Sequence, residues 1–320
     1  MKAVFYSENG GPEVMQYGDR PDPELQDDSV LIRSEAISIE GGDLLNRLIA
    51  PPDPVPFIPG YQAAGTVEAV GPSVTLFQPG DRVVAFNWSG SHAELFAAPE
   101  SFTYAIPDAL DLSLAAVTPI AFGTAYDALI EYGKLQRGET VLIQGAGGGV
   151  GLAAVQIAKA AGATVIGTSS SDERLELIRP FGLDHGINYR EEDIAERCLA
   201  ISGGKGIDLA VDLAGGKGKD LLVKALRPHG RYAAVGAATA DIPSFSFFEL
   251  IGEMLNVFGV SLGQEMHTER VRALVADIFA KLGDGSYRMP IDKTFALSDA
   301  VAAHRHVAES HPFGRVIMTP

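Results

Sequence analysis

Residues 141–151 read Val-Leu-Ile-Gln-Gly-Ala-Gly-Gly-Gly-Val-Gly, and this stretch decides the fold. A strand-like apolar run ends before the glycines, and a helix-like run follows over residues 150–161. Ala146, Gly148 and Gly151 fall at the spacing of a dinucleotide fingerprint. Small residues let the chain approach a pyrophosphate, which the helix N-terminus attracts. We therefore predict a dinucleotide site formed by Ala146, Gly147, Gly148, Gly149, Val150 and Gly151.

Outward from this turn, short apolar runs alternate with helical stretches. That rhythm is typical of a parallel sheet with helices on both faces. The predicted strands are residues 140–144, 164–168, 208–212, 231–235 and 256–260. We therefore predict an α/β fold in which residues 119–262 form a Rossmann domain with a doubly wound parallel sheet.

The first 118 residues have a different pattern, with short strands separated by glycine and proline turns. The clearest strand candidates are residues 29–33, 65–70 and 81–86. Close spacing of this kind indicates an antiparallel, barrel-like β-domain. A helix over 268–282 and a strand over 314–318 are expected to return to it, so that residues 1–118 and 263–320 form one discontinuous domain.

The end of the second strand of the Rossmann domain indicates which cofactor is bound. NAD-binding proteins place an acid there to accept hydrogen bonds from the ribose, but this chain has hydroxyl residues and no acid before Asp172. Ser169, Ser170 and Arg174 can hold a 2′-phosphate, which an acid would repel. Tyr189 can close over the adenine or the phosphate from the next turn. We therefore predict NADPH in preference to NADH.

Composition excludes several classes of partner. The net charge of −16 would repel nucleic acid, and no apolar run approaches the roughly 20 residues needed to span a membrane. The single cysteine, Cys198, allows no intrachain disulfide and is expected to be a packed or surface thiol. The N-terminal Lys2 to Tyr6 alternates like a strand and not like a signal peptide. We expect a cytoplasmic protein.

Several longer motifs carry a family resemblance that covers nearly the whole chain. They are residues 148–159 (GGVGLAAVQIAK), 187–190 (INYR), 206–212 (GIDLAVD), 59–65 (PGYQAAG) and 79–83 (PGDRV). With these motifs the chain resembles the zinc-independent quinone oxidoreductase (zeta-crystallin-like) branch of the medium-chain dehydrogenase/reductase superfamily.

The resemblance implies a GroES-like catalytic domain, a Rossmann domain and a cleft between them. It implies NADPH as hydride donor, a quinone or related α,β-unsaturated carbonyl compound as small-molecule substrate, and a homodimer. By position, Ser169, Arg174 and Tyr189 match the family's contacts to the 2′-phosphate and adenosine, and Thr124 matches a threonine near the nicotinamide.

The superfamily contains zinc-dependent and zinc-independent members, and this chain lacks the zinc ligands of the first group. Glu40 stands at the position of a ligand cysteine, and Tyr61-Gln62 stands where the zinc-dependent members have His-Glu. One cysteine can supply neither a catalytic nor a structural zinc site, so no metal is expected. Glu40 and Leu45 also replace an asparagine and a tyrosine that are common near the substrate, which leaves the particular acceptor open.

Three residues are candidate catalytic groups. Thr124 or Tyr61 could donate to the substrate oxygen on which negative charge develops, and Tyr61 or a water could deliver the final proton. Glu40 is either a protonated acid in an apolar cleft, favoured by Asp43, or a carboxylate held by backbone N–H groups at Gly41-Gly42. We expect positioning to dominate, with no single essential side chain.

Two other functions stay open at this point. One is an NADPH-dependent 2-alkenal or enone double-bond reductase, which would give two-electron products. The other is a non-catalytic NADPH-binding protein.

Overall fold

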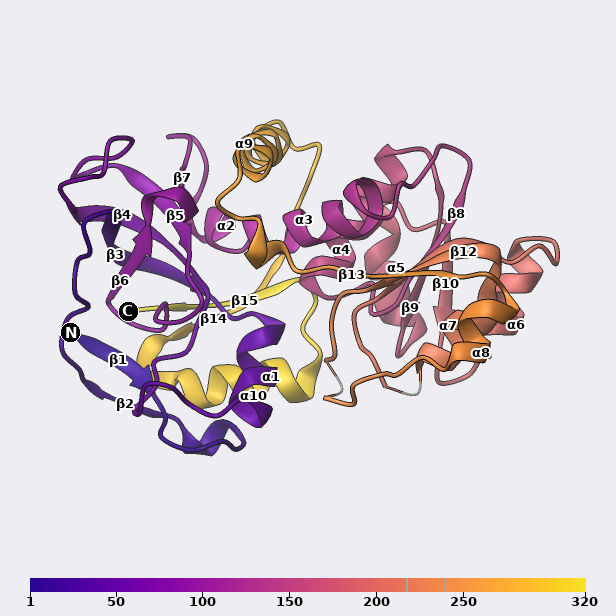
Figure 1. Cartoon of the computed structure of the whole chain (residues 1–320), viewed down its shortest axis with the longest axis horizontal. Coiled ribbons are helices and arrows are strands. Elements are labelled where there is room, and N and C mark those ends of the chain that lie inside the picture. The colour runs from indigo at the N-terminus through magenta and orange to yellow at the C-terminus, as the bar shows by residue number, and fades with distance from the viewer. Residues whose placement is uncertain (217, 239) are drawn as a thin grey trace. The chain divides into compact units, whose positions relative to one another are not determined.

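The computed structural model describes residues 1–216, 218–238 and 240–320. The chain forms two compact units. Unit 1 comprises Met1–Ile120 together with Gly263–Pro320, and unit 2 comprises Ala121–Leu262. Both ends of the colour scale in Figure 1 therefore belong to unit 1, and the magenta-to-orange middle belongs to unit 2.

Unit 2 is built on a six-stranded sheet in which all neighbouring strands run parallel. The strand order is β10-β9-β8-β11-β12-β13, so the chain starts in the middle, moves to one edge and then returns to build the other half. This is the order of a Rossmann sheet and confirms the predicted fold class. The strands are β8 (Thr140–Ile143), β9 (Thr164–Ser169), β10 (His185–Asn188), β11 (Ile207–Asp212), β12 (Leu226–Ala234) and β13 (Asn256–Gly259).

Helices connect the strands of unit 2. They are α4 (Gly149–Ala160), α5 (Asp172–Ile178), η4 (Arg179–Phe181), α6 (Ile194–Ile201), α7 (Gly218–Ala225) and α8 (Phe247–Gly252). Before β8 come α3 (Pro119–Tyr126), which begins in unit 1, and the π-helical turn η3 (Asp127–Glu131), and after β13 comes η5 (Leu262–Gln264), which ends in unit 1. One core cluster joins Leu142, Ile166 and Tyr232 from the sheet to Cys198 of α6. Burial raises the pKa of the Cys198 thiol to about 12, so this residue is a packing group.

Unit 1 contains a seven-stranded sheet in the order β14-β15-β3-β4-β5-β7, with β6 paired to β3, and a separate β1–β2 hairpin. Its pairs are antiparallel except for β14 and β15. The strands are β1 (Lys2–Phe5), β2 (Gln16–Asp19), β3 (Ser29–Ser38), β4 (Gln62–Val70), β5 (Arg82–Phe86), β6 (Leu95–Pro99), β7 (Thr103–Ala105), β14 (Ile291–Ala296) and β15 (Arg315–Thr319). Because Ile317 of β15 lies opposite Ser38 of β3, the C-terminal segment completes the N-terminal sheet.

Helices of unit 1 pack around this sheet. They are η1 (Pro12–Val14), α1 (Gly41–Ile49), η2 (Glu100–Phe102), α2 (Leu112–Ala116), α9 (Glu269–Gly283), η6 (Leu297–Asp299) and α10 (Ala300–Ser310). The core cluster brings Ile32 and Ile37 of β3 against Ala303 of α10 and Met318 of β15. Residues near the two ends of the sequence therefore share one core.

Several strands, among them β3, β4 and β12, are longer than the sequence indicated, and the ladders of β3 and β12 contain irregularities. β3 continues beyond Arg33 to Ser38, with register shifts in its ladder to β4. β12 begins at Leu226 although Pro228 follows, since its register against β11 shifts near that point. A bulge accommodates residues that cannot join a regular ladder.

Candidate active site

The glycine-rich turn forms between β8 and α4, as the sequence predicted for the fold. Gly145 has a φ of +71°, which favours glycine, and Gly148 is the residue before the first helical turn. A Cβ at Gly151 would lie 2.3 Å from the carbonyl oxygen of Gly145, so the helix can pack on the turn only with glycine there. The turn is tied to the adjacent strand, because the N–H of Ala146 donates to the carbonyl oxygen of Thr168 at 3.1 Å.

The start of α4 offers donors to an anion. Among the described residues no side chain caps the N-terminus of this helix. Its first backbone N–H groups and the positive end of its dipole are therefore suited to a phosphate. The neighbouring Gln144 Oε1 is buried without a hydrogen-bond partner in the described part of the chain, and as an acceptor it suits a hydroxyl and not a phosphate. The helix start itself therefore has the polarity that a dinucleotide pyrophosphate requires.

The predicted 2′-phosphate residues come together at the ends of β9 and β10. Ser169 ends β9 and is buried, and the N–H of Tyr189 donates to its carbonyl oxygen at 3.1 Å. Ser171 caps α5 by accepting from the N–H of Arg174 at 3.4 Å, so Arg174 lies on the first turn of that helix. Ser170 lies between these two segments, and Tyr189 is 47% exposed. The backbone thus brings Ser169 and Tyr189 together, and Arg174 follows on the next helix.

Thr124 lies on α3, in unit 2, and is partly exposed. Its neighbour Gly123 packs against Leu262, where a Cβ would approach Leu262 Cδ2 to 2.5 Å. At Gly123, α3 therefore packs directly against Leu262, the last residue of unit 2.

Glu40 immediately precedes α1 and is 3% exposed. Its carboxylate forms an ion pair with Arg315 of β15 and accepts a hydrogen bond from Ser38 Oγ at 2.8 Å. Arg315 also donates to Ser38 Oγ at 2.6 Å and to the carbonyl oxygen of Ile39 at 2.9 Å. Because a guanidinium can only donate, Glu40 acts here as an acceptor. Of the two readings of Glu40, the ion pair fits the carboxylate and not the protonated acid, and its main partner is Arg315, which the sequence did not reveal.

Asp43 is the buried acid of this region. Its Oδ2 accepts from the N–H of Glu40 at 2.8 Å, and its Oδ1 has no partner among the described residues. Burial raises the pKa of Asp43 to about 8. Asp43, and not Glu40, is therefore the carboxyl of this region whose neutral form is favoured.

Tyr61 directly precedes β4, and its hydroxyl accepts a hydrogen bond from Asn46 Nδ2 of α1 at 2.5 Å. Burial raises the pKa of Tyr61 above its usual value, and the nearby Asp43 and Glu40 add to the shift. The phenol therefore stays protonated over the range in which enzymes usually work. Asn46 is a second residue of this region, after Arg315, that the sequence did not single out.

The zinc-ligand positions are occupied by residues with structural partners. Gln62 Nε2 donates to the carbonyl oxygen of Ala116, and Gln62 Oε1 accepts from the N–H of Ile120 at 3.2 Å. No group of three or more His, Cys, Asp or Glu residues in the described part of the chain could hold a metal ion.

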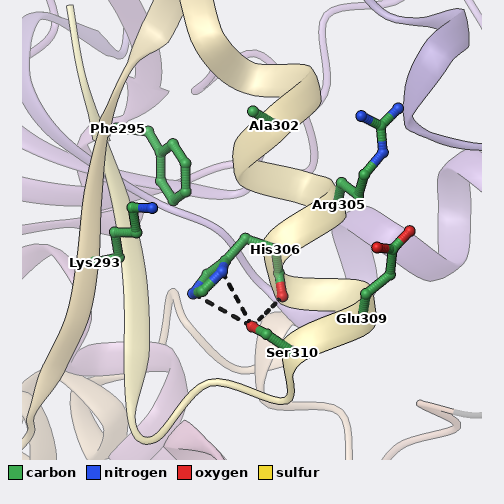
Figure 2. A pocket seen from close by; sticks show the side chains of 7 residues that line it. All are labelled: Lys293, Phe295, Ala302, Arg305, His306, Glu309 and Ser310. Atoms are coloured by element: carbon green, nitrogen blue, oxygen red, sulfur yellow. Dashed lines mark hydrogen bonds between the residues drawn. The ribbon is translucent and has the colours of Figure 1, made fainter.

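A pocket of about 410 Å³ lies between β14 and α10 of unit 1 (Figure 2). The lining residue His306 has its Nε2 2.7 Å from Oδ2 of Asp292, which lies outside the lining, and Ser310 Oγ is 3.1 Å from His306 Nδ1. This order resembles a nucleophilic triad, but Ser310 Oγ is also 3.3 Å from Nε2 and donates to the carbonyl oxygen of His306 at 2.6 Å. The hydroxyl is not aligned with one ring nitrogen, so it is not activated.

No helix in the described residues combines the length and the apolar character that crossing a membrane requires.

Comparison with known proteins finds two family models that match the chain. The alcohol dehydrogenase GroES-like domain matches residues 26–108, and the zinc-binding dehydrogenase model matches residues 149–280. Together with the Rossmann sheet, these matches define a two-domain dehydrogenase/reductase. The chain belongs to the quinone oxidoreductase, or zeta-crystallin-like, branch of the medium-chain dehydrogenase/reductase superfamily and is an oxidoreductase.

Three relatives illustrate the likeness. The chain is 33% identical to a quinone oxidoreductase of Pseudomonas aeruginosa, over 100% of this chain and 99% of the relative. It is 31% identical to a 2-haloacrylate reductase of a Burkholderia species, over 100% of this chain and 99% of the relative. The structure of Escherichia coli quinone oxidoreductase complexed with NADPH matches with a TM-score of 0.95 and 27% identity, and all of each chain is covered.

Proposed function

We propose that this protein uses NADPH to reduce a conjugated carbonyl compound, without a metal. The observation that carries the proposal is the end of β9, which is tied to the glycine turn through Thr168 and to Tyr189 through Ser169, with Arg174 on the first turn of the helix that follows. This arrangement offers a 2′-phosphate hydroxyls and a cation where NAD-binding proteins have an acid. A related protein of known structure, 27% identical over the whole chain, is described as an NADPH complex.

Each part of the cofactor would meet a different group of residues. The N-terminus of α4, with Ala146, Gly147, Gly148, Gly149, Val150 and Gly151, would hold the pyrophosphate. Ser169, Ser170, Arg174 and Tyr189 would hold the adenosine and its 2′-phosphate. Thr124 would lie near the nicotinamide. When bound, the cofactor supplies the hydride, and the protein supplies orientation and electrostatics.

The side chains of unit 1 would hold the acceptor and stabilise charge. As hydride adds to the β-carbon, negative charge grows on the carbonyl oxygen, and a fixed donor lowers that barrier. Tyr61, whose phenol is protonated, is our candidate donor in unit 1, and Thr124 is the candidate in unit 2. The ion pair with Arg315 makes Glu40 a residue that holds the start of α1 and not a proton donor.

Quinones and alkenals remain the two acceptor classes to separate. One full-length relative is called a quinone oxidoreductase and another a 2-haloacrylate reductase, and both names describe reduction of a conjugated system. We propose a quinone or a related α,β-unsaturated carbonyl compound as the substrate. A 2-alkenal or enone double-bond reductase is the alternative, favoured by the haloacrylate relative and by Glu40 and Leu45.

The test is a spectrophotometric screen of NADPH oxidation. The acceptors are 9,10-phenanthrenequinone, a 2-alkenal and a cyclic enone, each with NADPH and with NADH. We expect turnover with NADPH and at least one acceptor. Tight NADPH binding without turnover on any acceptor would refute catalysis and favour a non-catalytic NADPH-binding protein.

We also propose that the protein forms a homodimer through the β13 edge of unit 2. β13 is an outer strand of the sheet, and α8 before it exposes Phe247, Phe248 and Ile251 to 67%, 78% and 51%. An open strand edge beside exposed aromatic residues is suited to pairing with a second copy. The net charge of −16 disfavours nucleic acid as an alternative partner.

A further inference from the structure

We infer that Asn46 is a positioning residue, which fixes the Tyr61 hydroxyl as a hydrogen-bond donor to the carbonyl oxygen of the acceptor. Asn46 lies on α1, and Tyr61 lies immediately before β4, so the contact joins two elements of unit 1. The inference rests on the proposed reduction of a conjugated carbonyl compound and names a specific donor for it.

The hydrogen bond between Asn46 and Tyr61 determines in which direction the phenol can donate. Asn46 Nδ2 donates to Tyr61 Oη at 2.5 Å, which occupies one lone pair of the phenol oxygen. A phenol has a single O–H proton, and this contact does not use it. The amide therefore directs that proton away from α1. Without the amide, the hydroxyl would rotate freely about its C–O bond, and a preorganised donor would be lost.

The packing around Tyr61 holds the ring in the same place. A Cβ at Gly42 would lie 2.5 Å from Tyr61 Cε2 and 2.8 Å from its hydroxyl, so the ring fills the space that glycine leaves. On another side the ring of Phe86 lies at 6.1 Å between centroids. Gly42, Asn46 and Phe86 thus fix the position of the ring and the direction of its hydroxyl together.

The electrostatics favour a donor that keeps its proton. Burial is the largest cause that raises the pKa of Tyr61, and Asp43 and Glu40 follow. A phenol that resists ionisation is a poor proton donor to an enolate, but it keeps the O–H that a hydrogen bond to the enolate oxygen requires. Tyr61 thus stabilises the charge on oxygen and does not supply the final proton.

The reaction balances without proton transfer from Tyr61. Hydride from the reduced nicotinamide forms the new C–H bond at the β-carbon, and the π-electron pair of the C=C bond moves to give an enolate. The acceptor gains two electrons and the nicotinamide loses two. The enolate oxygen is stabilised by the Tyr61 hydroxyl, and a proton from water completes the saturated carbonyl product.

The first experiment compares Tyr61→Phe with Asn46→Asp, using NADPH and a 2-alkenal or enone that the wild type reduces. Aspartate has nearly the size of asparagine, but it accepts the phenol proton where the amide donates. We therefore expect both variants to lower kcat by about a hundredfold, the usual cost of losing one oxyanion donor, with little change in KM. The double variant should lose no more than either single one, because both remove the same hydrogen bond.

Two further variants test separately whether an added negative charge on α1, or a displaced Tyr61 ring, changes kcat. Leu48→Asp adds a negative charge to an exposed position two residues further along α1 and should retain wild-type kcat. Gly42→Ala removes a poor helix former but displaces the Tyr61 ring, so thermal stability should hold while kcat falls at least tenfold. The fluorescence of Trp88, the single tryptophan, reports the folding of each variant.

The outcomes distinguish this inference from the proposed function. If the wild type reduces the acceptor and folded Asn46→Asp keeps at least half of its kcat, Asn46 does not position the donor. If Leu48→Asp loses as much as Asn46→Asp, the effect is one of charge, and the inference is again wrong. If the wild type reduces none of the acceptors, it is the proposed function that fails.

Discussion

At the residue scale, we propose that Ser169 and Arg174 determine the preference for NADPH over NADH. Arg174→Gln removes a guanidinium that we expect to form charge-assisted hydrogen bonds to the 2′-phosphate, while the rest of α5 is unchanged. We predict that the KM for NADPH rises about 10- to 100-fold and that the KM for NADH stays the same. Steady-state kinetics with both cofactors provides the measurement.

Arg179→Gln is the matched control for this prediction. Arg179 is exposed, follows the same helix and pairs with Glu176 at 2.6 Å. It should leave both KM values unchanged. Equal losses for NADPH and NADH in Arg174→Gln would instead mean that Arg174 stabilises the fold or contacts a part common to both cofactors.

Glu40 tests whether a carboxyl in the active-site region is structural. Glu40→Ala leaves Arg315 buried and unpaired, and removing one member of a buried ion pair costs about 3–5 kcal/mol. We predict a loss of that size in the free energy of unfolding, followed in urea by Trp88 fluorescence. Glu40→Gln should be destabilised less and should retain most of its kcat.

That second variant decides the role of Glu40. Suppose that Glu40→Gln has the same urea midpoint of unfolding as the wild type but a kcat more than a hundredfold lower. The carboxyl would then act in the reaction itself. The sequence could not reveal the pairing, because Arg315 and its other partner Ser38 are 277 residues apart. Only the pairing of β15 with β3 brings them together.

At the scale of elements, three buried side chains connect α1, α10 and the loop before β6. Arg47 Nη1 lies 2.6 Å from His304 Nδ1, so that nitrogen must accept, and the proton of neutral His304 is on Nε2. His304 Nε2 is 3.0 Å from His92 Nε2, which must therefore be the acceptor. Burial lowers the pKa of His92 to about 3 and that of His304 well below its usual value.

This network predicts the effect of acid on unit 1. Between about pH 6.5 and 3 the unfolded chain binds protons that the folded histidines do not, so stability falls as the pH falls. Each histidine contributes a slope of up to about 1.4 kcal/mol per pH unit. The double variant His92→Gln/His304→Gln should unfold in urea with a shallower pH dependence between pH 6.5 and 4.5. An unchanged slope would contradict the assigned neutral pair.

Helices and strands could be predicted from the sequence where a local hydrophobic pattern or a single turn motif determines them. The glycine turn, β8, α4 and β9 follow from local pattern, and the structure has them with bounds shifted by only one residue at most. α1 was not predicted, because Gly41-Gly42 disfavours a helix and its N-terminal bond comes from the buried Asp43. Asn46 was missed for the same reason, since a residue in an unrecognised helix has no predicted face.

At the scale of the whole molecule, the homodimer proposal makes a measurable prediction. The chain has a mass of 33.8 kDa, and light scattering after gel filtration should give twice that value. Phe248→Glu places a charge on the most exposed aromatic residue of α8 and should give the monomer. Leu76→Glu, at a 59% exposed position in unit 1, should remain dimeric. A monomeric wild type would contradict the proposal.

The division of the chain into a nucleotide-binding unit and a β-rich unit was also accessible from sequence, because the two patterns differ over long stretches. The acceptor was not, since it depends on side chains such as Asn46, Tyr61 and Glu40, whose partners only the fold brings together. The central claim is therefore the chemistry: hydride passes from NADPH to a conjugated carbonyl compound without a metal.

The most direct test supplies NADPH deuterated at the transferred position to the purified protein, with a 2-alkenal or enone and an excess of chelator. Mass spectrometry and NMR then locate the label in the product. We predict a saturated carbonyl compound with one deuterium at the β-carbon, formed at the same rate with and without chelator. Deuterium at the carbonyl carbon, or a rate abolished by the chelator and restored by zinc, would contradict the account.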